Sequence, residues 1–323
     1  MSERQVLSLA FLKPVYELES RIEQLDSIVQ VKKISLINEI KILKYQLSEL
    51  KKEIFSSLTP LQRLHFVRQA DRPTTLDYVN SILDDWVELH GDRGGADDSA
   101  LVGGLGTLSN QTVVFIGHQR GKDTKDNLIR NFGMPSPGGY RKALRLMNHA
   151  NRFNFPILTF IDTPGAWAGI EAEKLGQGEA IAVNLREMFS FKVPIICTVI
   201  GEGGSGGALG IGVGDRILML EYAVYTVATP EACAAILWKD SKLSLEAAEA
   251  LKITSPDLKI LGIIDRIVKE PLGGSQSSPI DASMILKTVL MEELNALSSL
   301  SIVERQNLRY GKFRKIGTFY EEI

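Results

Sequence analysis

The feature that most constrains this sequence is an apolar run that ends in a loop of nearly bare backbone. Residues 194–200 read Pro-Ile-Ile-Cys-Thr-Val-Ile, and seven of the next twelve residues, 201–212, are glycine. Because glycine has no Cβ, its N–H group can approach a ligand closely and can adopt φ > 0 without strain. The small residues that follow can begin a helix whose positive end faces the same point. The pattern predicts a buried strand followed by a loop that stabilises a negatively charged oxygen.

Two other kinds of site also place a glycine loop after a strand. The phosphate-binding pattern G-x-x-x-x-G-K-[ST] fails, because Gly-Ala stands at residues 207–208 where Lys-Ser or Lys-Thr is needed. The dinucleotide pattern G-x-G-x-x-G matches at Gly201, Gly203 and Gly206. Glu221 then closes the next apolar run, where a ribose-binding acid would stand. The glycines between residues 206 and 217 make a poor crossover helix, but a dinucleotide-binding oxidoreductase remains an alternative.

A second loop of small residues follows another short apolar run. Residues 156–161 lead directly into residues 162–169, Asp-Thr-Pro-Gly-Ala-Trp-Ala-Gly. Two neighbouring parallel strands would bring both loops to the same edge of a sheet, with N–H donors on either side of one oxygen. Each loop by itself could be no more than a tight connection between a strand and a helix. The pair favours an oxyanion hole for a thioester enolate or a similar delocalised anion.

The rest of the chain predicts a layered α/β core with helical segments at both ends. Apolar residues recur every three or four positions near the N-terminus, at Leu36, Ile40, Leu43, Leu47, Leu50 and Ile54, which is typical of amphipathic helices. These helices either pack on each other or grip a partner subunit. Residues 100–108 and 112–117 alternate as a strand pair joined at Ser109-Asn110. Helices are expected at 75–89, 141–153, 175–189, 232–238, 245–251 and 285–297, the last at the periphery, and a strand at 263–268.

These patterns divide the chain into three parts. We expect a helical arm over 1–56, an α/β core over 57–270 and a C-terminal helical extension over 271–323. The net charge of −2 argues against general nucleic-acid binding, and no run is long enough to span a membrane. The histidines at 65, 90, 118 and 149 lack metal-ligand spacing, so no metal site is predicted. Cys197 and Cys233 are expected to be reduced thiols.

Four long segments together carry a resemblance to a known family, at residues 117–135, 140–147, 162–169 and 201–212. They look like the alpha subunit of the bacterial and plastid-type acetyl-CoA carboxylase carboxyltransferase. The resemblance covers nearly the whole chain and is loosest before Lys51 and after Pro271. It implies a ClpP/crotonase-like spiral core and a beta subunit of the same fold, in an alpha2beta2 assembly that works with biotin carboxylase and the biotin carboxyl carrier protein. It also implies carboxyl transfer from carboxybiotin to acetyl-CoA, giving malonyl-CoA for fatty acid biosynthesis.

The resemblance assigns roles to the two loops. The N–H groups of Gly206 and Gly207 would form the biotin-side oxyanion hole, with Gly165 and Ala166 as the facing loop. The acyl-CoA hole would belong to the beta subunit, so this chain alone is expected to be inactive. Biotin would be carried by the carrier protein and not by this chain, with acetyl-CoA as the substrate and no metal. The substrate is further expected to contact Gly203, Gly204 and Ser205, and Lys122 or Lys125 in the polar stretch after residue 118.

A second interpretation from another class is a non-catalytic assembly subunit that keeps the fold and presents its helical arm to partners. Intact glycines in both loops argue against it, since a scaffold does not need them. Residues 165–178 are similar to cyanobacterial and plastid versions, and the N-terminus lacks signal or transit-peptide features. We therefore expect the chain in the plastid stroma or in the cytoplasm of a cyanobacterium-like bacterium.

Overall fold

A mixed eight-stranded sheet forms the centre of the computed structural model, which describes residues 9–32 and 36–317. The strand order is β1-β2-β3-β4-β5-β6-β8, and β7 pairs with the end of β5. The first three strands are antiparallel, whereas β3, β4, β5, β6 and β8 run parallel to one another. The strands are β1 (Asp85–Glu88), β2 (Leu101–Leu108), β3 (Gln111–His118), β4 (Ile157–Thr163), β5 (Ile195–Gly204), β6 (Arg216–Leu220), β7 (Val224–Thr226) and β8 (Arg266–Val268).

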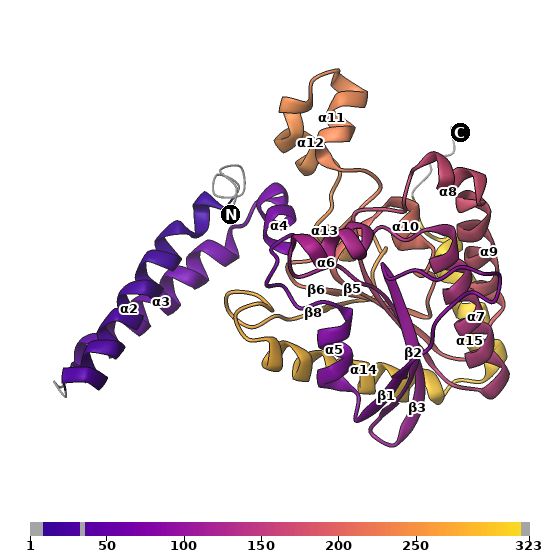
Figure 1. The fold of residues 1–323 in the computed structure, drawn as a ribbon, viewed down its shortest axis with the longest axis horizontal. Coiled ribbons are helices and arrows are strands. Elements are labelled where there is room, and N and C mark those ends of the chain that lie inside the picture. Colours follow the sequence, from indigo (N-terminus) through magenta and orange to yellow (C-terminus); the bar gives the residue numbers. More distant parts are fainter. Residues whose placement is uncertain (1–8, 33–35, 318–323) are drawn as a thin grey trace, which may run out of the picture.

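Helices cover both faces of this sheet (Figure 1). On one face α7 packs against α9 and lies over β2 and β3, while on the other α14 packs against α5 and β5. The helices of the core and the lobe above it are α4 (Pro60–Val67), α5 (Thr75–Ile82), α6 (Thr124–Ile129), α7 (Pro137–Phe153), α8 (Ile170–Lys174), α9 (Gln177–Ser190), α10 (Ser205–Leu209), α11 (Pro230–Trp238), α12 (Ser244–Ala250) and α13 (Ser255–Ile260), with short 3-10 turns at Asn131–Gly133 and Ser241–Leu243. Among the described helices none is long and apolar enough to cross a membrane.

The two strands that lead into the glycine loops are buried along their whole length. Every residue of β4 and of β5 is buried, as expected for parallel strands covered by helices on both faces. Their apolar runs therefore lack the alternation seen in a half-exposed strand. The sheet positions both loops because β4 and β5 are parallel neighbours, paired from Ile157 with Ile195 onward.

The predicted elements are confirmed over most of their ranges, with exceptions at 75–89 and at 263–268, where the strand β8 covers only Arg266–Val268. The strand pair predicted at 100–108 and 112–117 is present as β2 and β3. The helix predicted over 75–89 is wrong in its second half, because α5 ends at Ile82 and β1 follows. Trp86 pairs with Gly106 across the sheet and packs its ring against Phe115, 5.6 Å away. Sheet pairing at this edge outweighs the local helical pattern.

The N-terminal helices form an antiparallel hairpin that projects from the body of the molecule (Figure 1). The hairpin consists of α2 (Lys13–Lys32), which follows a short 3-10 turn at Ala10–Leu12, and α3 (Ile37–Ser56). It contacts the body at its base, where Phe55 packs edge-on against Phe66 and Tyr222. Farther out, Ile42 and Tyr45 are more than half exposed. The hairpin is therefore anchored at one end and presents exposed apolar side chains along its length.

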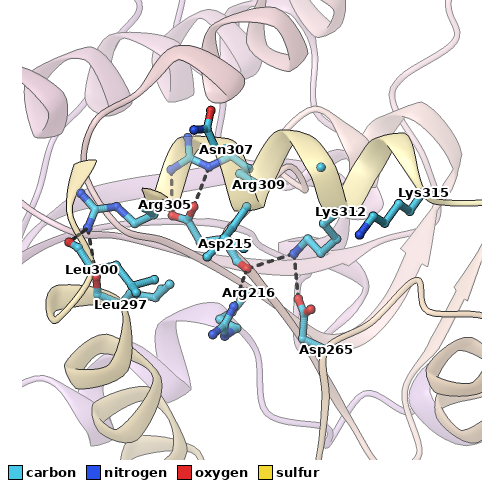
Figure 2. A pocket seen from close by; sticks show the side chains of 12 residues that line it. Asp215, Arg216, Asp265, Leu297, Leu300, Arg305, Asn307, Arg309, Lys312 and Lys315 are labelled. Atoms are coloured by element: carbon cyan, nitrogen blue, oxygen red, sulfur yellow. Dashed lines mark hydrogen bonds and ion pairs between the residues drawn. The ribbon is translucent and has the colours of Figure 1, made fainter. Parts of the chain in front are cut away.

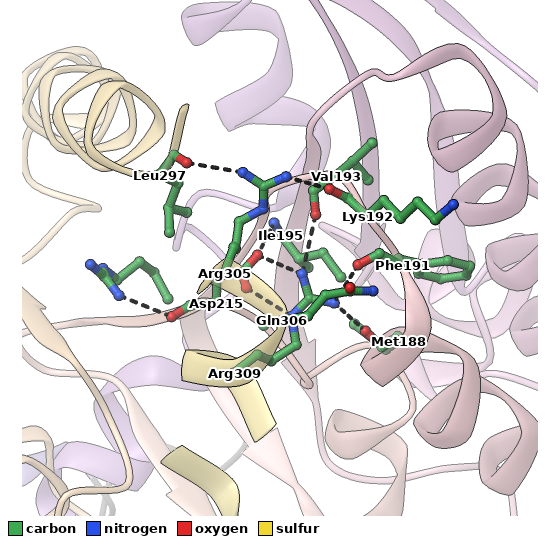
Figure 3. A network of polar contacts seen from close by, with 12 residues as sticks. Met188, Phe191, Lys192, Val193, Ile195, Asp215, Leu297, Arg305, Gln306 and Arg309 are labelled. Carbon is green, nitrogen blue, oxygen red and sulfur yellow. Dashed lines mark hydrogen bonds and ion pairs between the residues drawn. The ribbon is translucent and has the colours of Figure 1, made fainter. Parts of the chain in front are cut away.

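The C-terminal helices pack closely on the sheet. They are α14 (Pro279–Ser298) and α15 (Ile302–Arg314). The inner face of α14, including Leu286 and Leu290, belongs to the main core, so this helix is more than the peripheral element that its sequence suggests. On α15 the guanidinium of Arg309 forms a two-pronged ion pair with Asp215, both bonds 2.8 Å long (Figure 3). Both side chains are almost completely buried.

The Arg309–Asp215 pair yields a stability prediction. In Arg309→Ala the Asp215 carboxylate stays buried without its partner, and we expect the free energy of unfolding to fall by about 3–5 kcal/mol. Arg314→Ala on the same helix is the matched control, because Arg314 is exposed and its loss should change stability by less than about 0.5 kcal/mol. Urea denaturation of the full chain measures both values. Equal stability of the two variants would mean that the buried pair does not anchor α15.

Candidate functional site

The two glycine loops meet at the carboxyl ends of β4 and β5. A Cβ atom built on Gly204 would lie 2.1 Å from the carbonyl oxygen of Pro164. One built on Gly207 would lie 2.3 Å from the nitrogen of Ala166 and 2.5 Å from the carbonyl carbon of Gly165. No side chain fits at either position without moving the backbone. The structure thus brings together the two loops that the sequence predicted to converge.

Gly206 differs from its neighbours because it is open. An added Cβ there would have no atom within 4 Å, and the residue is only partly buried. Gly206 and Ser205 border a mainly apolar pocket of about 550 Å³, together with Leu209, Gly212, Ile217, Tyr225, Thr226, Val227, Leu251, Leu258, Ile263, Phe313 and Ile316. A volume of this size is typical of a small-molecule site. The pocket therefore places a free surface directly beside the start of α10.

The backbone at the start of α10 is arranged to donate hydrogen bonds. Ser205, Gly206 and Gly207 are its first three residues, and the first N–H groups of a helix have no acceptor within the helix. Ser205 adopts φ = 50°, a left-handed conformation that is strained for a residue with a side chain. Strain of this kind is typical of functional turns, and here it directs the chain from β5 sharply into α10. The site can therefore hold one anionic oxygen at N–H groups.

On the facing loop, the two predicted residues Gly165 and Ala166 differ in their contacts. The N–H group of Gly165 donates to the Oγ1 atom of Thr163 at 3.1 Å, so it is already used within the loop. Gly165 adopts φ = 153°, and its contribution is to the path of the backbone. The N–H group of Ala166 lies against Gly207 across the contact between the loops. Ala166 therefore stays the predicted residue of this loop whose N–H group is a candidate donor.

Buried charges support the loops from beneath. The Glu202 carboxylate, on β5, accepts bonds from Arg68 at 2.9 and 2.6 Å and from Arg120 at 2.8 Å. Arg120 also lies 3.0 Å from Asp162, and Asp162 accepts the N–H group of Glu202 at 3.0 Å. Burial alone would raise the pKa of Glu202, but Arg68 and Arg120 hold it below its usual range. Burial raises the pKa of Asp162 despite the opposing charge of Arg120.

Two buried side chains orient the backbone behind the Gly207 peptide. The hydroxyl of Tyr140 donates to the carbonyl oxygen of Gly207 at 3.0 Å. His118 lies under the same loops, and its Nδ1 atom is 3.4 Å from the N–H group of Asp162. Burial lowers the pKa of His118 to about 3, so the ring is neutral. The Tyr140 bond fixes the peptide that follows the Gly207 N–H group, and His118 contacts the end of β4.

Comparisons with known proteins agree on one family. Residues 8–317 match the model of the acetyl co-enzyme A carboxylase carboxyltransferase-like family. The acetyl-coenzyme A carboxylase carboxyl transferase subunit alpha of Gracilaria tenuistipitata var. liui is 74% identical over 321 residues, covering 99% of this chain and 98% of the relative. The subunit of the same name from Crocosphaera subtropica is 64% identical over 320 residues, covering 99% and 96%. The chain belongs to the family of acetyl-CoA carboxylase carboxyltransferase alpha subunits.

Solved structures show the same fold at low sequence identity. One subunit of a Pseudomonas malonate decarboxylase hetero-tetramer in complex with coenzyme A has a TM-score of 0.58 at 18% identity, covering 74% of this chain and 95% of that one. Transcarboxylase 12S has a TM-score of 0.53 at 20% identity, covering 66% and 41%. These likenesses confirm the predicted crotonase-like α/β fold, and membership of the family makes the chain a component of a carboxyltransferase.

Several other residues that the sequence suggested for this alpha-subunit site lie elsewhere. Gly203 and Gly204 are buried, the first against the ring of Tyr225, and neither borders the pocket. Lys122 forms an exposed ion pair with Asp77, 2.6 Å long, and Lys125 is exposed on α6. Neither lysine borders the pocket beside Gly206. Contact of Lys122 or Lys125 with the substrate stays a prediction. The described residues around them do not form a substrate site.

The alternative dinucleotide site is not supported by the position of Glu221. Its carboxylate accepts a bond from Lys269 at 2.6 Å and one from the N–H group of Glu270 at 3.3 Å, so it is held at the end of β8. It does not border the pocket beside Gly206. Within the described residues there is also no group of three or more His, Cys, Asp or Glu side chains placed to hold a metal.

The charged residues beneath the loops are not predicted by the sequence patterns. Arg120 stands in the same polar stretch as Lys122 and Lys125. One signal was present, because Asp162 and Glu202 each end or interrupt a strongly apolar run. A carboxylate buried in such a strand requires a cationic partner. The identity of the partners lies outside any local pattern, since Arg68 and Arg120 are 134 and 82 residues from Glu202.

The two neighbouring glycines provide a direct test of the loop contact. Gly207→Ala puts a Cβ atom 2.3 Å from the backbone of Ala166, so we expect it to lower the thermal midpoint by several degrees. Gly206→Ala meets open space and should leave the midpoint unchanged or slightly higher, because alanine is favoured over glycine in a helix by up to about 1 kcal/mol. Thermal unfolding of the full chain compares them. Equal midpoints would contradict the close approach of the loops.

The buried His118 predicts a pH dependence of stability. Its pKa in the folded chain, about 3, lies well below the value of about 6.5 expected in the unfolded chain. The unfolded chain therefore takes up a proton that the folded chain does not. The contribution of the neutral His118 to the free energy of unfolding is fully present above about pH 6.5. It is lost as the pH falls toward the pKa of the folded chain, at up to about 1.4 kcal/mol per pH unit.

The measurement compares urea unfolding of the full chain at pH 7 and at pH 5 with that of His118→Asn. Asparagine does not titrate, so we expect a smaller loss of stability in the variant even if its stability at pH 7 is lower. Both pH values lie above the range in which most carboxylates titrate. The same loss in both proteins would show that another group takes up the proton.

Proposed function

We propose that this chain is the alpha half of a carboxyltransferase that moves the carboxyl group from carboxybiotin to acetyl-CoA, forming malonyl-CoA. The observation that carries the proposal is the contact between the two glycine loops, with Gly206 left open beside an apolar pocket of about 550 Å³. The family and its relatives support the reaction. The site itself supports a role in holding an anionic oxygen.

In this proposal the chain acts through its backbone. The N–H groups of Gly206 and Gly207 at the start of α10, with that of Ala166 on the facing loop, would hold the developing negative charge. Such donors are fixed before the reaction begins, so little reorganisation is needed as the charge develops. The loss of one donor of this kind typically costs about 3–4 kcal/mol in the transition state. Tyr140 would keep the Gly207 peptide in place through its bond to the carbonyl oxygen.

The pocket suits a compact ring system on its apolar side and a polar oxygen at its glycine end. Leu209, Tyr225 and Val227 provide apolar walls, while Ser205 and Gly206 provide the polar edge. The residues present therefore fit a biotin ring delivered from outside, with its ureido oxygen toward the N–H groups. Bound biotin would supply the carboxyl group that is transferred. The neutral His118 and the paired Glu202 leave no free charge beneath the loops to compete with that oxygen.

A beta subunit would complete the enzyme. An alpha subunit implies a beta partner, and this chain offers one pair of converging glycine loops for two anions that must be stabilised. We propose an alpha2beta2 assembly in which the beta subunit holds the acyl-CoA oxygen, together with a biotin carboxyl carrier protein and a biotin carboxylase. The glycines of both loops argue against a purely structural subunit. Relatives from a red alga and a cyanobacterium support a plastid stroma or a cyanobacterium-like cytoplasm as the location.

A valine at position 206 tests the donor role. Its side chain would project into open space, so the fold and the assembly with the beta subunit should be retained. It would nevertheless block the approach of a ligand to the N–H groups, and we expect carboxyl transfer to fall on the order of 10²-fold. The assay is malonyl-CoA decarboxylation with free biotin, using alpha and beta subunits purified together.

Gly178→Val is the matched control, because Gly178 also lies in a helix with no atom within 4 Å of an added Cβ. It should keep nearly normal activity. Gly207→Val does not serve this purpose, because its side chain would force the loops apart and the loss of activity would follow from misfolding. Near-normal turnover by an assembled Gly206→Val enzyme would overturn the proposed role of α10.

A further inference from the structure

A second pocket lies at the opposite end of the parallel strands from the glycine loops. It has a volume of about 480 Å³ and is bordered by α15, by the end of α14 and by Asp215 and Asp265 (Figure 2). These two acids immediately precede β6 and β8, which run parallel to β5. The pocket is therefore at the amino ends of the strands, whereas the loops of the proposed active site follow their carboxyl ends. The proposed reaction has no use for it.

The pocket carries more positive than negative charge. Its border includes five cationic side chains, Arg216, Arg305, Arg309, Lys312 and Lys315, and two carboxylates, Asp215 and Asp265. Three of the cations have carboxylate partners, since Arg309 pairs with Asp215, Lys312 with Asp265 and Arg216 with Glu293. Within the described chain Arg305 and Lys315 have no carboxylate partner. Among the residues that the structure describes, these two positive charges are therefore not neutralised by an ion pair.

Arg305 is buried and forms no ion pair with a carboxylate among the described residues. It is 6% exposed and donates to the backbone carbonyl oxygens of Leu297, at 3.0 Å, and Lys192 (Figure 3). Its Nε atom has no hydrogen-bond acceptor among the described residues. Burial lowers the pKa of Arg305, and the charge on Asp215 does not offset this effect. A buried guanidinium that borders a pocket without a carboxylate partner is stabilised by an anion in that pocket.

Lys315, the residue directly after α15, supplies the second charge. Its side chain is exposed, and Figure 2 shows its amine directed toward Lys312. Lys312 already donates to Asp265 at 2.8 Å and to two backbone carbonyl oxygens, of Gly214 and Asp215. Lys315 is thus the exposed cation that borders the pocket, and Arg305 is the buried one.

We propose that this pocket binds a phosphate group, either as the free ion or as the monoester of a small molecule. A phosphate carries about two negative charges at neutral pH, which matches Arg305 and Lys315. Arginine is well suited to phosphate because its planar N–H groups match the tetrahedral oxygens. The volume exceeds that of the bare ion and is in the range of small-molecule sites, so there is room for the group that a monoester would carry.

Binding of a phosphate in this pocket would affect the proposed active site through the end of α15. Lys312 and Lys315 border this pocket, whereas Phe313 and Ile316, from the same segment at the end of α15, border the apolar pocket beside Gly206. A phosphate held by Lys315 would fix that segment, and with it one wall of the apolar pocket. The site is therefore placed to regulate the enzyme and not to take part in its chemistry.

The test measures binding of inorganic phosphate, AMP and adenosine to the full chain by calorimetry, with ionic strength held constant by NaCl. We expect saturable binding of phosphate and AMP and none of adenosine. The tighter of the first two identifies the free ion or the monoester as the natural form. Lys315→Gln should weaken binding about tenfold, as expected for the loss of one charge-assisted contact.

Two further variants make the result decisive. Lys41→Gln removes the same charge from an exposed position on α3, far from the pocket, and should not change the affinity. Arg305→Lys keeps the charge but loses the planar donors, and should also weaken binding. If Arg305→Lys does not fold, the comparison of phosphate affinity between Lys315→Gln and Lys41→Gln still tests the proposal. The absence of saturable phosphate binding, or an equal effect of Lys315→Gln and Lys41→Gln, would overturn the proposal.

Discussion

The structure depends on a contact between two backbones that leaves no room for a side chain. The loops after β4 and β5 touch at Gly204 and Gly207, each of which lies against the chain of residues 164–166. Only parallel, adjacent strands bring two such loops to one point, and only glycine allows them to approach so closely. The contact therefore fixes where α10 begins and the direction in which its first N–H groups point. The rest of the core holds these two strand ends in register.

Buried charges hold the strand ends from beneath, and their arrangement explains why removal of one would be costly. Arg120 joins Asp162, at the end of β4, to Glu202, near the end of β5, and Arg68 completes the set. Charges withdrawn from water rarely add stability overall, but the loss of one partner leaves another uncompensated, typically at about 3–5 kcal/mol. The set therefore specifies one arrangement of the loops more than it stabilises the fold. It also uses up the local charge, so the N–H groups above face a neutral interior.

Local patterns in the sequence predicted the parts that are local, and the structure supplied the contacts that are distant. The strands, both loops and the helical hairpin follow from apolar periodicity and glycine placement over a few residues. β1 was missed because its pairing with β2 is a tertiary contact that overrides its helical pattern. The occupied N–H group of Gly165 was missed because the acceptor is a side chain, Thr163, whose rotamer no pattern reveals. The partners of Glu202 could not be predicted either, because Arg68 and Arg120 are distant from it in the sequence.

The glycines at and after the end of β5 have different structural roles, and this changes the interpretation of the glycine-rich motif. Gly203 makes room for the ring of Tyr225, Gly204 and Gly207 make room for the facing loop, and Gly210 makes room for Tyr140. Each of these is explained by packing, without any ligand. Gly206 is different, because an added Cβ there would meet nothing in the chain. A helix position with space for a side chain would gain stability from alanine. Gly178 in α9 is equally open, but only Gly206 borders the apolar pocket, so the glycine at position 206 is best explained by a ligand that needs this space. The functional interpretation of the whole motif therefore depends on this one residue.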